Sequence, residues 1–137
     1  MGRPDLSERR VYALTALIVF AVEIVIALFV ADNLIRPYAG DALAVVLVYL
    51  VLRAAMSWRL VPALAAALMI AIVIELGQLI HVLDIVGLGH NRWARTVFGG
   101  VFDLRDFAAY AGGGVIVALG EHWRRRIGSS KAVVRRA

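Results

Sequence analysis

The sequence predicts an all-α fold, an integral membrane bundle of four transmembrane helices, and two observations support this prediction. Of the 137 residues, 62% are hydrophobic and the mean hydropathy is +0.82, whereas soluble domains are about 45–50% apolar. The apolar residues also fall in four long blocks separated by polar segments. Most of these blocks approach the ~20 residues that a helix needs to cross a ~30 Å hydrocarbon core. The excess of apolar residues is therefore expected to face lipid.

The first two predicted helices cover residues 11–31 and 42–56. Three arginines precede the first block, which is too long for the hydrophobic part of a signal peptide and contains Glu23. The polar segment 32–41 contains a proline and a glycine, which break helices. We therefore expect a break there, with Asp41 as the N-cap of the second helix.

The third and fourth predicted helices cover residues 60–83 and 106–123. Pro62 falls in the first turn of the third helix, where proline is tolerated. A polar outer loop, residues 84–105, joins the two helices. Small residues recur four positions apart in the fourth helix, a spacing that permits close packing, so we expect this helix to press against the third.

The distribution of charge predicts the orientation and the domain boundaries. Arginine and lysine gather at both ends of the chain and in the short loop that contains Arg53 and Arg59. Because cytoplasmic loops are enriched in these residues, both termini are predicted to be cytoplasmic in a multi-pass protein of the cell (inner) membrane. Residues 1–123 are expected to form one transmembrane domain. Residues 124–137 are expected to form a basic cytoplasmic tail that is disordered beyond Gly128.

Several polar residues are predicted to gather in the outer half of the bilayer. A charged side chain at membrane depth costs about 2.5–3.5 kcal/mol on insertion scales, so it usually has a partner or a role. At about 1.5 Å per residue, Glu23, Tyr49 and Glu75 fall at similar depths. Asp41 and Asp106 begin helices at the same surface. These groups therefore indicate a shallow cavity that opens to the outer side.

The faces of the third and fourth helices define a candidate ligand site. Glu75 and Gln78 are three residues apart, so they share a helix face, and Asp106 and Tyr110 are four apart. Arginines of the outer loop are expected to fold over these residues, where they could pair with carboxylates or bind phosphate. The predicted ligand-binding residues are Glu75, Gln78, Arg92, Arg95, Asp106 and Tyr110, supported by Glu23, Arg36, Asp41, Tyr49 and Asp103.

Each of these residues also has a purely structural interpretation. Glu75 with Gln78 could form an interhelical hydrogen bond, and the two aspartates could be N-caps. The chain has no cysteine, and His81 and His90 lack a metal-like spacing, so no metal and no cofactor are expected. The net charge of +5 is better explained by topology than by nucleic-acid binding.

Three motifs occur in order along the chain. Residues 36–43 read Arg-Pro-Tyr-Ala-Gly-Asp-Ala-Leu and are followed by Val48-Tyr49; residues 75–78 read Glu-x-x-Gln; residues 99–113 read Gly-x-x-Phe-x-x-x-Asp-x-x-x-Tyr-x-x-Gly. Together they resemble an uncharacterised family of small bacterial four-helix membrane proteins, known as a domain of unknown function. The resemblance covers roughly residues 36–120 and implies a four-helix membrane fold without an established activity.

The same pattern is distantly similar to VanZ-like membrane proteins. Those carry Glu-x-x-Gln, then Arg, then Asp-x-x-Asp-x-x-x-Asn-x-x-Gly. Asp103 and Asp106 match this pattern, but Tyr110 stands in place of the asparagine and Arg95 is the nearest upstream arginine. The likeness implies a connection with the cell envelope.

The leading hypothesis is a non-enzymatic membrane protein of the cell envelope that binds a small anionic or lipid-linked ligand. Its expected partners are the lipid bilayer, that ligand, and a second copy or another membrane protein, with no nucleic acid. One alternative is an enzyme acting on a lipid head group, with Glu75 or Asp106 as general base. The other is a structural or assembly partner in which the motifs serve only to pack the bundle.

Overall fold

The structure is a computed structural model that describes residues 3–32, 35–92, 94 and 103–134. In these residues the fold is all-α, as predicted, and no strand occurs. The helices, in chain order, are α1 (Leu6–Phe29), α2 (Ile35–Met56), α3 (Leu60–Leu79), α4 (Val82–Ile85) and α6 (Asp106–Val134).

Helix α1 begins at Leu6, earlier than the predicted residue 11, because a capping box starts it. The Asp5 carboxylate accepts a hydrogen bond from the Glu8 backbone N–H at 2.8 Å, and the Glu8 carboxylate accepts one from the Asp5 N–H at 3.2 Å. These bonds satisfy donors that a helix start leaves unpaired, so the polar first turn is helical. The bond from Glu8 lowers the pKa of Asp5.

The predicted break before the second helix is shorter than expected, because α2 already begins at Ile35. Pro37 lies in the first turn, where a missing N–H costs no hydrogen bond. The position of a Cβ on Gly40 has nothing within 4 Å, so this glycine is not required for packing. Asp41 is consequently inside the helix and is not its N-cap, which makes its side chain available to neighbouring helices.

Helices α3 and α6 also end at residues that differ from the predictions. Helix α3 stops at Leu79, and His81 adopts a left-handed conformation with φ of 51° before the single turn of α4. Helix α6 continues through the basic segment to Val134. The predicted disorder beyond Gly128 is therefore wrong for residues 129–134. Arginine is a good helix former, which is consistent with this extension.

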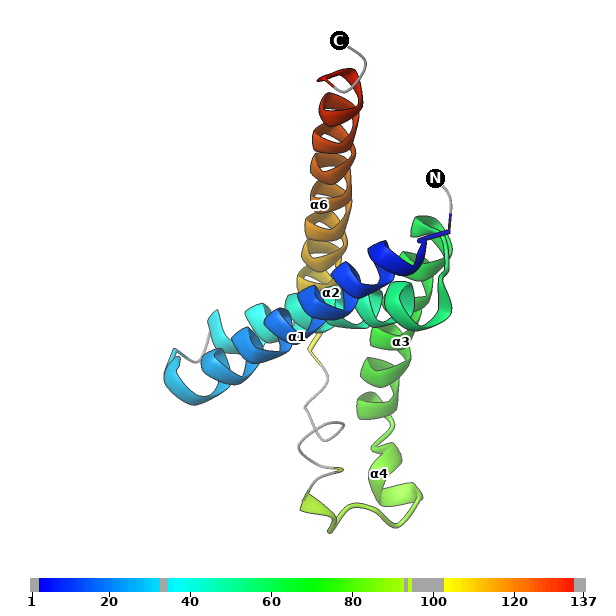
Figure 1. Cartoon of the computed structure of the whole chain (residues 1–137). Helices are drawn as coiled ribbons and strands as arrows, with labels where there is room; N and C mark the ends of the chain where they lie inside the picture. The colour runs from blue at the N-terminus through cyan, green and yellow to red at the C-terminus, as the bar shows by residue number, and fades with distance from the viewer. Residues whose placement is uncertain (1–2, 33–34, 93, 95–102, 135–137) are drawn as a thin grey trace.

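Helices α1 and α2 lie side by side as an antiparallel pair, and α6 packs mainly along α2 and more lightly on α3 (Figure 1). A Cβ on Gly113 would meet the carbonyl oxygen of Ala42 and would lie 3.0 Å from Val45 Cβ, both in α2. Helix α6, the fourth of the predicted helices, therefore makes its closest contact with α2 rather than with α3. Both termini lie at the upper side of Figure 1, opposite α4.

Large apolar side chains cover the outside of the molecule, as expected for a protein surrounded by lipid. Leu14 is 61% exposed, Val61 72% and Phe29 78%. In the described part of the chain, three helices are long and apolar enough to cross a membrane: α1, residues 36–56 of α2, and α3. The chain is therefore a membrane protein with three such helices.

The predicted count of four spans is not confirmed, because α6 is not among these helices. Its apolar part extends from Phe107 to Gly120, which is 14 residues between Asp106 and Glu121. A crossing helix usually needs about 20 apolar residues. Helix α6 nevertheless packs along α2. The polar residues that flank its apolar part therefore contact the other helices.

Candidate functional site

Polar side chains gather at two separate places in the helix assembly. The first, here called the carboxylate cluster, consists of Asp41, Glu75, Asp103, Asp106 and Tyr110. It joins α2, α3, the segment before α6, and the first turns of α6. It contains five of the residues that the sequence predicted for the site, brought together from distant parts of the chain.

Glu75 lies at the centre of the carboxylate cluster and is only 1% exposed. One carboxylate oxygen accepts a hydrogen bond of 2.9 Å from the backbone N–H of Asp103. The other accepts one of 2.9 Å from the Tyr110 hydroxyl. Both oxygens are thus engaged by neutral donors, which connect α3 to the start of α6.

Asp41 and Asp106 face each other across the contact between α2 and α6. Their carboxyl groups share a hydrogen bond, and each interacts electrostatically with Glu75. Two carboxyl groups can bond in this way only when one of them holds a proton, because two ionised groups would repel each other. The cluster is therefore a place where a proton, or a group carrying positive charge, is favoured.

The open side of the cluster carries a guanidinium group. The Asp103 carboxylate accepts a hydrogen bond of 2.9 Å from the Arg105 backbone N–H. The Arg105 side chain is hydrogen-bonded to the Tyr38 hydroxyl, and this bond, together with the charge of Asp103, raises the pKa of Arg105. Arg105 and Tyr38 were not among the predicted site residues, although both lie within the motifs.

The other predicted residues lie in different surroundings. The Tyr49 hydroxyl donates a hydrogen bond to Glu121 instead, in the second group described below. Arg36 and Arg92 are exposed and Gln78 is half-buried. Glu23 has a buried oxygen with no hydrogen-bond partner among the described residues. The predicted role of Arg95 lies outside the residues that the structure describes.

A second group, the tyrosine–glutamate cluster, consists of Tyr12, Tyr49, Arg53, Glu121 and Arg124. One carboxylate oxygen of Glu121 accepts hydrogen bonds from the Tyr12 hydroxyl at 2.6 Å and the Tyr49 hydroxyl at 2.8 Å. Arg124 Nε lies 3.4 Å from the other oxygen. Glu121 is 5% exposed, so α6 is held to α1 and α2 by a buried carboxylate.

Arg53 extends this network to the turn between α2 and α3. It is 1% exposed, and donates hydrogen bonds to the Tyr12 hydroxyl at 2.7 Å and to the Trp58 carbonyl at 2.6 Å. Its guanidinium also lies 4.7 Å from the centre of the Tyr12 ring, a favourable cation–π contact. Sequence reasoning missed this cluster because it took arginines near helix ends, such as Arg53, only as markers of membrane orientation. The i, i+4 spacing of Tyr49 and Arg53 was the available signal.

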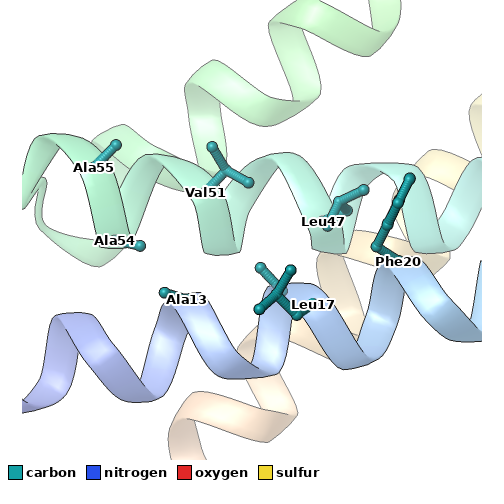
Figure 2. A pocket seen from close by; sticks show the side chains of 8 residues that line it. Ala13, Leu17, Phe20, Leu47, Val51, Ala54 and Ala55 are labelled. Atoms are coloured by element: carbon teal, nitrogen blue, oxygen red, sulfur yellow. The ribbon is translucent and has the colours of Figure 1, made fainter.

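The largest hollow among those we describe has no polar side chain. It lies between α1 and α2, has a volume of about 570 Å³, and is lined by Ala13, Ala16, Leu17, Phe20, Leu47, Val51, Ala54 and Ala55. Figure 2 shows its labelled side chains, all of carbon, coming from these two helices. Without hydrogen-bonding groups it cannot orient a polar ligand, so we do not place the functional site there.

A smaller hollow of about 230 Å³ adjoins the tyrosine–glutamate cluster, between α1, α2 and α6. Its walls are apolar apart from the side chains of that cluster and Thr15. In the parts of the chain that the structure describes, no group of three or more histidine, aspartate or glutamate side chains is placed to hold a metal ion.

Comparison with known proteins identifies the family. No curated protein and no solved structure matches the chain. One family model, described as a protein of unknown function (DUF2809), matches residues 30–114. The matched segment includes all five residues of the carboxylate cluster, whereas Tyr12 and Glu121 lie outside it. Because the match covers more than half of the 137 residues, this chain belongs to the DUF2809 family.

Proposed function

We propose that this chain is a non-enzymatic integral membrane protein of the bacterial cell envelope whose carboxylate cluster binds a small or lipid-linked ligand. The observation that carries the proposal is the hydrogen bond between Asp41 and Asp106 beside the buried Glu75. Three acids on three helices repel one another when ionised, so packing alone does not favour their convergence. A ligand that supplies positive charge or hydrogen-bond donors would favour it.

The chemistry of the cluster favours an ammonium-bearing ligand over the small anion predicted from the sequence. Among the described residues, the cluster holds four carboxyl groups, with the guanidinium of Arg105 beside them. An amine, or a lipid head group that carries one, would therefore be complementary to the site.

The arrangement of charges supports an outward orientation for the site. The cluster lies on the turns of α6 that are farthest from the C-terminus, whereas the basic segment follows Glu121. If the basic ends are cytoplasmic, as the positive-inside rule suggests, the cluster faces the outer side of an inner membrane. A ligand would then reach it from the outer leaflet.

The contacts of Glu75 favour binding over catalysis. Both of its oxygens accept hydrogen bonds from the chain and the side chain is only 1% exposed, so a substrate has little access to it as a general base. The same contacts tie α3 to the start of α6, which favours the structural alternative, an assembly partner without a ligand. The two candidate functions differ in whether the carboxylate cluster holds a bound ligand.

Native mass spectrometry of the protein, extracted together with its own lipids, tests the proposal. The variant Asp106→Asn removes one acid from the cluster, and the matched control Glu121→Gln changes a buried acid of the tyrosine–glutamate cluster. We expect a bound species in the wild type and the control that Asp106→Asn loses. If no species is selectively retained, and Asp106→Asn only lowers the melting temperature, the cluster is structural and the proposal fails.

A further inference from the structure

A hollow with two arginines lies where α2 turns into α3, and no residue of either cluster lines it. Its volume is about 420 Å³, and it is lined by Arg3, Trp58, Arg59 and Pro62. Arg3 and Arg59 are both exposed. No carboxylate lines this hollow, and within the described ranges neither guanidinium forms a salt bridge or a side-chain hydrogen bond. The hollow therefore presents positive charge that the protein itself does not neutralise.

Other arginines form hydrogen bonds or ion pairs within the protein. Arg9 donates hydrogen bonds to the carbonyls of Ala54 at 2.6 Å and Ala55 at 3.0 Å, in the last turn of α2. Arg53 donates to the Trp58 carbonyl, and Arg124 pairs with Glu8 at 3.2 Å. The contrast with Arg3 and Arg59 indicates that these two serve a partner outside the chain.

The wall of the hollow is held in a fixed shape. Ser57, between α2 and α3, has a φ of 53°, a left-handed conformation that few residues other than glycine adopt. The bond from Arg53 fixes the next carbonyl, that of Trp58. Because arginines bind the backbone on both sides of this turn, Trp58 and Arg59 are presented by a rigid segment.

The position in the fold identifies the source of the partner. The turn joins two helices that are each long and apolar enough to cross a membrane, so it lies at a membrane surface. Tryptophan favours the level of the lipid head groups, and guanidinium groups bind phosphate through paired hydrogen bonds. We propose that this hollow, formed by Arg3, Trp58, Arg59 and Pro62, binds the phosphate of an anionic phospholipid.

Lipid titrations followed by native mass spectrometry test this proposal on the full chain in detergent. Phosphatidylglycerol and phosphatidylcholine with identical acyl chains are added separately to the wild type, to the double variant Arg3→Gln/Arg59→Gln and to the control Arg10→Gln/Arg126→Gln. The control loses the same net charge elsewhere. We expect the wild type and the control to retain phosphatidylglycerol preferentially, and the double variant to bind it at least about tenfold more weakly, the loss of one charged hydrogen bond or more.

Two results would overturn the proposal. One is an equal loss of the preference in both double variants, which would mean that only overall charge attracts the lipid. The other is displacement of the bound phosphatidylglycerol by micromolar inorganic phosphate, which would make the hollow a site for a soluble phosphate. Melting temperatures of all variants distinguish loss of binding from loss of folding, and a folded Arg3→Gln single variant with full binding would also contradict the assignment.

Discussion

Tyrosine hydroxyls are the main partners of two buried glutamates in this protein. Glu75 is bound by Tyr110, and Glu121 by Tyr12 and Tyr49. A hydroxyl donates a short, directed bond without a second charge that would itself need to be desolvated. Because both glutamates link helices distant in sequence, each tyrosine fixes the position of a helix as well as of a side chain.

Replacing Tyr110 by phenylalanine removes the hydroxyl that donates to Glu75. The glutamate oxygen is then buried without that donor, so we expect the free energy of unfolding to fall by about 1 kcal/mol or more. Equilibrium unfolding in mixed micelles measures the change. Thr15→Val is the control, since it removes a hydroxyl that bonds the Val11 carbonyl of its own helix. Equal effects of the two substitutions would contradict a special role for the bond to Glu75.

Glu23 is expected to lower the stability of the fold. One of its oxygens is buried without a hydrogen-bond partner in the described part of the chain, and an unsatisfied buried polar group costs about 1–3 kcal/mol. We therefore expect Glu23→Leu to raise the melting temperature in detergent, with a smaller rise for Glu23→Gln. A fall in both variants would mean that Glu23 has a stabilising partner.

At the scale of elements, the contact between α2 and α6 leaves no room for a side chain at Gly113. A side chain at Gly113 would collide with the backbone of Ala42, whereas the neighbouring Gly112 has open space. The sequence indicated that α6 packs through small residues, but the helix expected opposite it was the third, whereas Gly113 meets α2. Periodicity gives the face of a helix, and only the fold of the whole chain decides which neighbour lies against it.

Substitution of the two adjacent glycines tests this contact. Gly113→Ala should destabilise the protein, because the added methyl group forces α6 away from α2. Gly112→Ala should be neutral or stabilising by up to about 1 kcal/mol, since alanine favours helix more than glycine does. Melting temperatures of both variants provide the measurement. A greater loss for Gly112→Ala would mean that α6 is rotated relative to the structure.

Sequence reasoning predicted helix existence well and helix ends less well. The predicted helices all occur, but the polar first turns of α1 and α2 were taken as loops, because apolar content does not report capping. Part of the site was predictable because Glu75, Asp106 and Tyr110 lie in two motifs at helical spacing. Glu121, Arg53 and Tyr12 were not, because their association depends on the packing of three helices that no local pattern specifies.

At the scale of the whole molecule, the two clusters lie at opposite ends of the apolar part of α6, residues 107–120. Asp106 and Tyr110 belong to the carboxylate cluster, whereas Glu121 and Arg124 belong to the tyrosine–glutamate cluster. Residues between them include Gly113 and Val117, which are packed in the core. If α6 crosses the bilayer, the two clusters therefore face opposite sides of it.

Accessibility of single cysteines tests the topology, and the absence of native cysteine makes the readout clean. We expect Ser7→Cys, Ser57→Cys and Gly128→Cys to resist a membrane-impermeant maleimide in intact cells. His90→Cys should react. Labelling after permeabilisation is the control for each position. Reaction of Gly128→Cys in intact cells, with Ser7→Cys protected, would show that α6 does not cross and that the chain has three spans.

The short apolar part of α6 has a consequence for the surrounding lipid. Fourteen residues, Phe107 to Gly120, span only about 21 Å at ~1.5 Å per residue, against a hydrocarbon core of about 30 Å. If α6 crosses, local thinning of the bilayer beside it is one way in which this hydrophobic mismatch is met. Such a cost makes thin membrane regions the preferred location of the protein. The length of one helix would thus influence where in the cell surface the protein accumulates.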